Sequence, residues 1–324
     1  MRVAEQPVLA RHLAPRVPSG ATSAQRRRGA SRGVGTAEPD DPAILQAVPL
    51  TVVSWNINSL RARLPLVLRY LDERMPDVLC LQETRLPAEK VDCPAFRERG
   101  YHVAAGGTRG YAGVAVLSKA AFREVVHGIG PDSAHADRRL LCQVGEHWID
   151  NVYVPTRRAI GKSEFLDLLR ADLAERFEAA RDALVLCGDF NICFDERDLA
   201  SLRMISEPER FGDRPEDRAF RRMLSFGLQD CLRKHHPQAK RFSWFPLAPW
   251  ALKRNYGMRL DYIFASTPAY DSCTGADHDP EPRSWERPSD HLPVVARFDA
   301  PRATRRGGRG AAARAASRAS TKAR

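Results

Sequence analysis

The sequence predicts an α/β protein in which two sheets pack face to face and the helices lie outside them. Short apolar runs alternate with helical stretches, and the runs outnumber the helices. Several runs are apolar on both faces, so both faces of the sheets must be covered. No G-x-G-x-x-G or G-x-x-x-x-G-K motif occurs, which argues against a Rossmann or P-loop nucleotide-binding domain.

Seven apolar runs of four to seven residues predict the strands, which we place at residues 50–56, 77–82, 113–118, 148–154, 183–189, 260–265 and 293–298. Helices are expected at 63–75 and 162–180, where apolar residues form a stripe at helical spacing. A third helix is expected at 216–227, where Gly227 ends it.

The net charge of +11 belongs to the two ends of the chain. Residues 1–48 carry seven Arg and four acidic residues, and residues 301–324 carry seven Arg, one Lys and no acid. Both ends have low-complexity composition without apolar periodicity, so we expect them to be disordered extensions of a neutral folded domain at 49–300. The basic C-terminal tail is either a polyanion-binding segment or a solvated one. The N-terminal extension fits a transit peptide or a misassigned start.

Apolar runs and cysteines bear on the cellular compartment that we expect for the protein. No apolar run of 18 residues occurs, so no membrane partner is expected. The seven cysteines form no CxxC motif, which disfavours a disulfide framework and a zinc knuckle. We therefore expect a reducing compartment, the cytoplasm.

Polar residues gather at the ends of the predicted strands, where burial without partners would be costly. A single strand-end Asp is usually a turn or cap residue, but six strands here end in this way. Phosphodiester hydrolysis would use such a set. Glu83 and Asp290 offer the oxygen ligands that Mg²⁺ prefers. Asp189 and Asn191 point the same way and suit activation of a water, and His291 suits donation to a phosphoryl oxygen with Asp261 behind its ring.

Seven segments in order resemble the exonuclease III / class II AP endonuclease family, within the endonuclease/exonuclease/phosphatase superfamily. They are "SWNINSLRAR", "PDVLCLQETR", "GYAGVAVLSK", "LCGDFNI", "RFSWF", "GMRLDYIFAS" and "PSDHLPV", and they extend from Leu50 to Phe298. The resemblance implies a four-layer α/β/β/α sandwich. It also implies cleavage of DNA 5′ to abasic sites in base-excision repair, with Mg²⁺ or Mn²⁺, together with 3′→5′ exonuclease and 3′-phosphodiesterase activities. The expected partner is double-stranded DNA with abasic sites or 3′ ends, and the expected enzyme is a nucleoid-associated monomer.

The same resemblance assigns roles to individual positions. The residues matched to catalysis are Tyr153, Asp189, Asn191, Asp261 and His291. Those matched to the metal side are Glu83, Asn58 and Asp290. Those matched to substrate binding are Asn56, Tyr111, Arg139, Trp244 and Met258, the last two as walls of a pocket for a flipped abasic sugar.

Three places depart from the family pattern. Ser59 stands where the family has glycine. The loop 155–163 carries Thr156, Arg157 and Arg158 in place of an Asn/Gln–Gly pair, and residues 194–216 lack the sequence that is usual in the family. Two alternatives remain: a phosphoinositide phosphatase or sphingomyelinase of the same superfamily, and a non-catalytic nucleic-acid binding module. "RLDYIFAS" and "RFSWF" favour the DNA branch, and the intact catalytic set disfavours the binding module.

Overall fold

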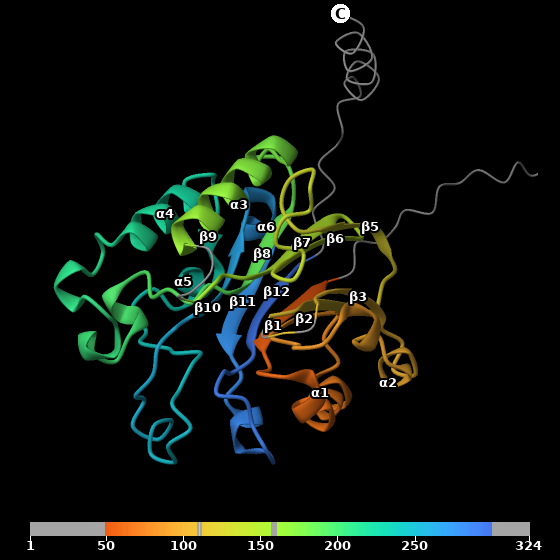
Figure 1. The fold of residues 1–324 in the computed structure, drawn as a ribbon, viewed down its shortest axis with the longest axis horizontal. Helices are drawn as coiled ribbons and strands as arrows, with labels where there is room; N and C mark the ends of the chain where they lie inside the picture. The colour runs from red at the N-terminus through yellow and green to blue at the C-terminus, as the bar shows by residue number, and fades with distance from the viewer. Residues whose placement is uncertain (1–48, 109, 111, 157–160, 300–324) are drawn as a thin grey trace, which may run out of the picture. The chain divides into compact units, whose positions relative to one another are not determined.

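A computed structural model describes residues 49–108, 110, 112–156 and 161–299, and within them the chain forms two six-stranded mixed sheets (Figure 1). The first sheet has the order β11-β12-β1-β2-β4-β3. Its strands are β1 (Leu50–Asn56), β2 (Val78–Gln82), β3 (His102–Gly106), β4 (Val114–Ser118), β11 (Cys273–His278) and β12 (Val294–Phe298). Only the β1–β2 pair is parallel in this sheet.

The second sheet has the order β5-β6-β7-β8-β10-β9 and again one parallel pair, β7–β8. Its strands are β5 (Phe122–His127), β6 (Arg139–Val144), β7 (His147–Tyr153), β8 (Leu184–Asp189), β9 (Gln229–Asp230) and β10 (Asp261–Ala265). In each sheet the parallel pair lies at the centre, so the carboxyl ends of two central strands meet at the same sheet edge.

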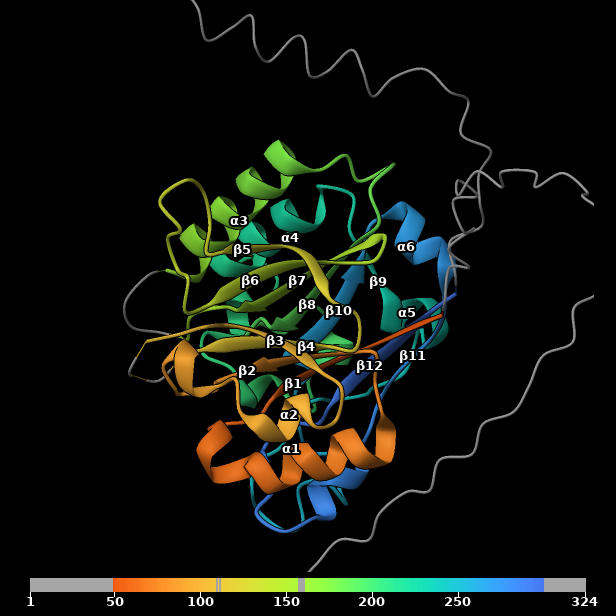
Figure 2. The same ribbon diagram turned by 90° about the vertical axis from the view of Figure 1, so that its right-hand side faces the viewer.

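Helices cover the outer face of each sheet, which gives four layers (Figure 2). α1 (Leu60–Arg74) and α2 (Pro94–Arg97) cover the first sheet, and α3 (Lys162–Arg176) and α4 (Pro215–Leu224) cover the second. The short helices α5 (Cys231–His235) and α6 (Thr267–Ser272) lie at one side of the sandwich. The predicted four-layer α/β/β/α arrangement is therefore confirmed.

Three apolar layers hold these elements together, and each draws on alternate faces of the strands. The layer between the sheets contains Val52, Val116 and Val185. The layer under α1 contains Val53 and Leu79, whereas the layer under α3 and α4 includes Leu184, Leu186 and Phe220. Because both faces of the central strands are buried, their sequences are mostly apolar.

All seven predicted strands are present, each within one residue of its expected bounds. The sequence did not reveal β3, β5, β9 and β11, which form the edges of the two sheets. It also did not reveal β6, a buried interior strand whose apolar residues are interrupted by Arg139 and Gln143. The three predicted helices are present too, although α1 begins three residues earlier and α3 ends four residues earlier than expected. The third helix, α4, ends at Leu224, so Gly227 does not end it as predicted. The predicted disordered ends, 1–48 and 301–324, lie outside the described residues.

Two compositional expectations can be compared with the described residues. All seven cysteines are free thiols. Among the helices of the described ranges, none has the length and apolar character needed to cross a bilayer.

Candidate active site

The polar strand ends of both sheets meet at one place. In the second sheet, Tyr153 pairs with Asp189 across β7 and β8, and Asp189 pairs with Asp261 across β8 and β10. In the first sheet, Asn56 pairs with Gln82 at the ends of β1 and β2. Register thus places these side chains at one level along the strands, as the sequence predicted.

Asn56 joins the two sheets at the centre of the site. Its fully buried side chain donates one hydrogen bond to Glu83 Oε1 (2.9 Å) and another to Asp189 Oδ2 (2.8 Å). Tyr153 Oη donates to the same Glu83 oxygen at 3.0 Å. A second bridge lies deeper, where Gln82 Nε2 donates to Asn151 Oδ1 at 2.7 Å. Asn56 therefore orients two carboxylates from different sheets, a role beyond the substrate contact expected for it.

Asp189 is buried and held at both oxygens. Its Oδ1 accepts the backbone N–H of Asn191 at 2.9 Å, and its Oδ2 accepts Asn56. Asn191 has φ 52°, and its side chain donates to the carbonyl oxygen of Val154 at 3.0 Å. The amide side chain of Asn191 is therefore turned toward β7, and its backbone N–H orients the carboxylate.

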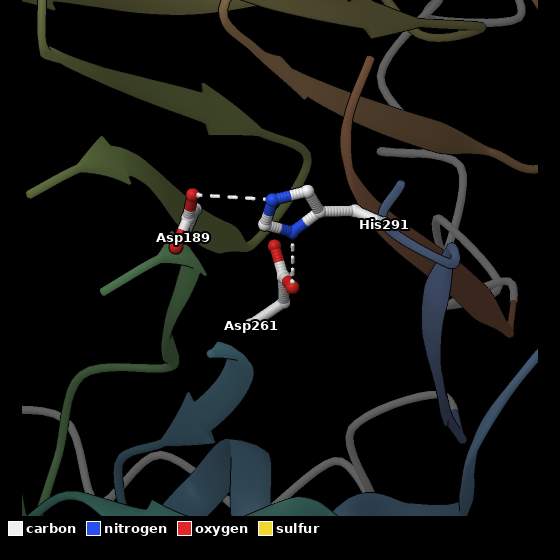
Figure 3. A group of neighbouring side chains, drawn as sticks. All are labelled: Asp189, Asp261 and His291. Atoms are coloured by element: carbon white, nitrogen blue, oxygen red, sulfur yellow. Dashed lines mark hydrogen bonds and ion pairs between the residues drawn. The ribbon is translucent and has the colours of Figure 1, made fainter. Parts of the chain in front are cut away.

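His291 lies between two carboxylates of the second sheet (Figure 3). Its Nδ1 is 2.8 Å from Asp261 Oδ2, and its Nε2 is 3.9 Å from Asp189 Oδ2. The Ser243 hydroxyl donates to the same Asp261 oxygen at 2.6 Å and accepts the backbone N–H groups of Leu260 and Asp261. Asp261 is thus fixed from behind and in turn fixes the imidazole.

Burial and neighbouring charge set the protonation of this group. Burial, and then the Asp261 carboxylate, raise the pKa of Asp189 to about 7. Burial alone would lower the pKa of His291, but Asp261 and Asp189 outweigh it and raise the pKa to about 10. Burial, followed by the charges of Glu83 and Asp189, raises the pKa of Tyr153 well above its usual value. At neutral pH the site thus holds an imidazolium, a protonated phenol and a carboxyl group poised near its pKa.

The metal-side residues form a neighbouring oxygen-rich cluster. Asn58 Nδ2 donates to Asp290 Oδ1 at 3.0 Å, and Trp244 Nε1 donates to Asp290 Oδ2 at 3.0 Å. Burial opposes ionisation of Asp290, but the His291 charge and these two hydrogen bonds outweigh it and lower its pKa. Arg85 Nε donates to Glu83 Oε2 at 3.0 Å. Two carboxylates and an amide, without sulfur, fit a hard cation such as Mg²⁺.

A second group could in principle bind an ion, because ligand atoms of Asp189, Asp261 and His291 lie within 4.8 Å of one another. His291 argues against it. Its Nδ1 is already paired with Asp261 Oδ2 at 2.8 Å, and Asp189 Oδ2 already accepts Asn56 at 2.8 Å, so the group is satisfied by protein partners. The Glu83 and Asp290 cluster is therefore the better cation site.

The two loops that carry the metal-side residues are joined through their backbones. The N–H groups of Ile57, Ser59 and Leu60 donate to the carbonyl oxygens of Gln82, Glu83 and Thr84 at 3.1, 2.8 and 3.0 Å. Asn58, Ser59 and Glu83 have φ angles of 46°, 92° and 52°, a region that residues with a side chain seldom adopt. The loops are thus fixed in strained conformations beside the site.

The prediction that Arg139 contacts DNA is wrong. Arg139 is fully buried in β6, where its Nε is 2.9 Å from Asp150 Oδ1 and its Nη1 is 2.6 Å from Asp172 Oδ2. It therefore ties β7 to α3 and is closed to a ligand. The neighbouring Arg138 is only partly buried, and its guanidinium lies 5.0 Å from the centre of the Tyr153 ring.

Trp244 and Met258 lie close to the residues predicted to be catalytic. Their backbones form two hydrogen bonds of 2.8 and 2.9 Å. The Trp244 backbone also pairs with that of His291 in an isolated antiparallel β-bridge. Met258 borders an open cavity of about 690 Å³, together with Leu260, Asn191 and Lys162. The Trp244 side chain instead donates a hydrogen bond to the Asp290 carboxylate. Tyr111, Arg157 and Arg158 lie outside the described residues.

Two serines of the site were not predicted from the sequence. Ser243 holds Asp261, and Ser289 donates to the Asn56 carbonyl oxygen at 2.7 Å while accepting the His291 N–H at 3.2 Å. Both are buried. Each lies next to a motif residue, in "RFSWF" and "PSDH", and that adjacency was the available signal.

Comparisons with known proteins agree with this geometry. Residues 53–291 match the Endonuclease/Exonuclease/phosphatase family. The chain is 30% identical over 263 residues to exodeoxyribonuclease III of Haemophilus influenzae, covering 76% of this chain and 98% of the relative. An AP endonuclease structure from Archaeoglobus fulgidus superposes with a TM-score of 0.70 at 31% identity, covering 77% of this chain and 99% of that one. A 3′ phosphatase from Neisseria bound to a product DNA hairpin gives the same values.

Proposed function

Because this chain belongs to the endonuclease/exonuclease/phosphatase family, we propose that it is a DNA-repair nuclease that cleaves at abasic sites and processes 3′ ends. The observation that carries the proposal is Asn56, which hydrogen-bonds the metal-side Glu83 and the catalytic Asp189 at the meeting point of both sheets. The phosphoinositide and sphingomyelin alternatives are not favoured, since the relatives described above are DNA enzymes.

The protonation states assign a role to each residue. Asp189, with a pKa near 7, accepts a proton from the attacking water, while Asn191 and Asn56 hold its two oxygens in place. His291 donates from Nε2 to a phosphoryl oxygen, and Asp261 stabilises the positive ring. Tyr153, kept protonated, supplies a further donor beside Glu83.

Glu83, Asn58 and Asp290 would hold the divalent cation, for which we propose Mg²⁺ with Mn²⁺ as a substitute. When bound, the cation would neutralise charge that develops on the phosphate. Asn58 and Trp244 keep the Asp290 carboxylate ionised and oriented, and the joined loops keep Asn58 close to Glu83.

The expected partner is double-stranded DNA with abasic sites or 3′ ends. The enzyme is expected to act as a monomer. We propose that the enzyme acts in the cytoplasm on the nucleoid. Trp244 and Met258 remain our candidates for contact with the abasic sugar, and Tyr111 for contact with DNA.

The decisive experiment compares cleavage of matched duplexes with an abasic site, with a 3′-phosphate at a nick, and with neither, in the presence and absence of a chelator. Cleavage at the abasic site or release of the 3′-phosphate should require a divalent cation. Glu83→Gln should reduce kcat about 100-fold or more, because the cation contributes several kcal/mol to the transition state. Undiminished turnover in this variant would contradict the metal assignment.

A second pair of variants separates chemistry from binding. Asp189→Asn and His291→Asn should lower kcat strongly while DNA affinity stays near the wild-type value. The matched control is Glu89→Gln, an exposed carboxylate close to the site in sequence, which should leave kcat unchanged. Loss of affinity without loss of kcat would show that Asp189 and His291 bind DNA and do not catalyse.

A further inference from the structure

Two cysteines far from the nuclease residues lie side by side at one end of the sandwich. Cys231 is the first residue of α5, and Cys273 is the first residue of β11, against which α5 packs (Figure 2). The Cys231 and Cys273 sulfurs lie close enough to interact, and this contact is the largest influence on both pKa values, raising that of Cys231 and lowering that of Cys273. The pair joins a segment that follows the second sheet's β9 to an edge strand of the first sheet.

A histidine completes the cluster. His235, one helical turn after Cys231 in α5, places its Nε2 3.6 Å from Cys273 Sγ. The contact with Cys231, and then the hydrogen bond from His235 against opposing burial, lower the pKa of Cys273 to about 6. Cys273 is therefore largely a thiolate at neutral pH, and the thiolate is the reactive form of cysteine.

We propose that Cys231 and Cys273 form a peroxide-oxidisable dithiol, a modification site separate from the nuclease site. The Cys273 thiolate attacks hydrogen peroxide, so that an S–O bond forms, the O–O bond breaks, and hydroxide leaves. The Cys231 sulfur then attacks Cys273, forming the S–S bond and releasing the sulfenic oxygen with the Cys231 proton as water. The two thiols lose two electrons and the peroxide gains them.

Access to this site is through α5. Cys273 is only 2% exposed, but His235 above it is partly exposed and α5 has five residues. A helix of this length opens by local unfolding at small cost, which admits a molecule as small as hydrogen peroxide.

The chain contains a matched internal comparison. Cys80 of β2 and Cys187 of β8 also lie close enough to interact, in the apolar layer between the two sheets. Both are 0% exposed, and burial, followed by the Cys187 contact, raises the pKa of Cys80 well above its usual value. Proximity of two sulfurs is thus common to both pairs, whereas a lowered pKa belongs to Cys273 alone among these four, and only the Cys231 and Cys273 pair lies beside a partly exposed residue of a short helix, His235.

The test treats the reduced full-length protein with hydrogen peroxide and maps the disulfides by mass spectrometry over time. A Cys231–Cys273 disulfide should form first. In Cys231→Ser, oxidation should stop at a sulfenic acid on Cys273, which dimedone traps. His235→Asn should slow the reaction about tenfold, because less thiolate is present at neutral pH.

Three results would overturn the proposal: a Cys80–Cys187 disulfide that forms as fast, a Cys273 that dimedone does not label in Cys231→Ser, or an absence of any Cys231–Cys273 disulfide in the wild type. The last result is read on the unaltered protein, so it does not depend on folding of a variant. Circular dichroism of each variant before oxidation provides the folding control.

Discussion

Ser59 is strained, and replacing it by glycine should stabilise the protein. Its backbone has φ 92° and ψ 106°, and its N–H is held by the Glu83 carbonyl oxygen at 2.8 Å. Such a conformation costs a residue with a side chain about 1–3 kcal/mol. Glycine relieves that cost but makes the unfolded chain more flexible, which takes back roughly 0.4–1 kcal/mol. The net expected gain is about 1 kcal/mol, or a rise in Tm of roughly 2–4 °C for a domain of this size.

The assay is thermal and urea unfolding of the wild type, Ser59→Gly and Ser59→Ala. Alanine is the matched control, because it keeps the Cβ atom and removes only a hydroxyl that makes no capping hydrogen bond to α1. Its free energy of unfolding should stay within about 0.5 kcal/mol of the wild type. A Ser59→Gly protein no more stable than Ser59→Ala would refute the strain argument. Nuclease activity should persist in both variants, since neither alters a proposed ligand.

Four further predictions concern other parts of the chain. In a urea titration, Arg139→Leu should lower the free energy of unfolding by about 3–5 kcal/mol, because it leaves Asp150 buried and unpaired. The control Arg176→Leu removes a partly exposed partner of Asp172 and should lower it by less than about 1 kcal/mol. Burial lowers the pKa of His278 to about 3, so its neutral form favours the fold; this stability is present above pH 6.5 and is lost as pH falls toward 3. The difference in unfolding free energy between pH 7 and pH 4 should therefore be smaller in His278→Gln, by about 2 kcal/mol, and an equal difference would contradict it. Deleting residues 301–324, which carry a charge of +8, should reduce the slope of log K for DNA binding against log salt concentration. An unchanged slope would show that the tail does not contribute to DNA binding. Arg157→Gly/Arg158→Gly should sharpen the ratio of kcat/KM on abasic over intact duplex, since arginine pairs with any phosphate; an unaltered ratio would count against the loop argument.

The sequence revealed the central strands and the polar residues of the candidate site for the same physical reason. A strand covered on both faces must be apolar, so a polar residue such as Asp189 or Asp261 at its end is conspicuous. Register then brings such ends together, because Asp189 pairs with Asp261 across β8 and β10. For these strands and their polar ends, the local sequence pattern was therefore sufficient for the prediction.

Other features depended on partners distant in sequence. Arg138 and Arg139 are equivalent in the sequence, but only Arg139 meets Asp150 and Asp172 and is buried. β5 was missed because its residues are charged or half-exposed at a sheet edge. Ser243 and Ser289 act through hydrogen bonds to residues that folding alone brings near, so their residue type carried no signal.

The bridge from Asn56 to Asp189 crosses from one sheet to the other, as does the bridge from Gln82 to Asn151. The site is therefore divided between two supports, with Tyr153, Asp189 and Asp261 on the second sheet and Asn56 on the first. The spacing of the two halves depends on how the inner faces of the sheets pack against each other. A substitution in that apolar layer, for example at Val116 or Val185, can shift one half of the site relative to the other without touching either half. In this architecture, turnover depends on the alignment of the two sheets. Moderate heating should therefore inactivate the enzyme at a lower temperature than the one at which the chain unfolds.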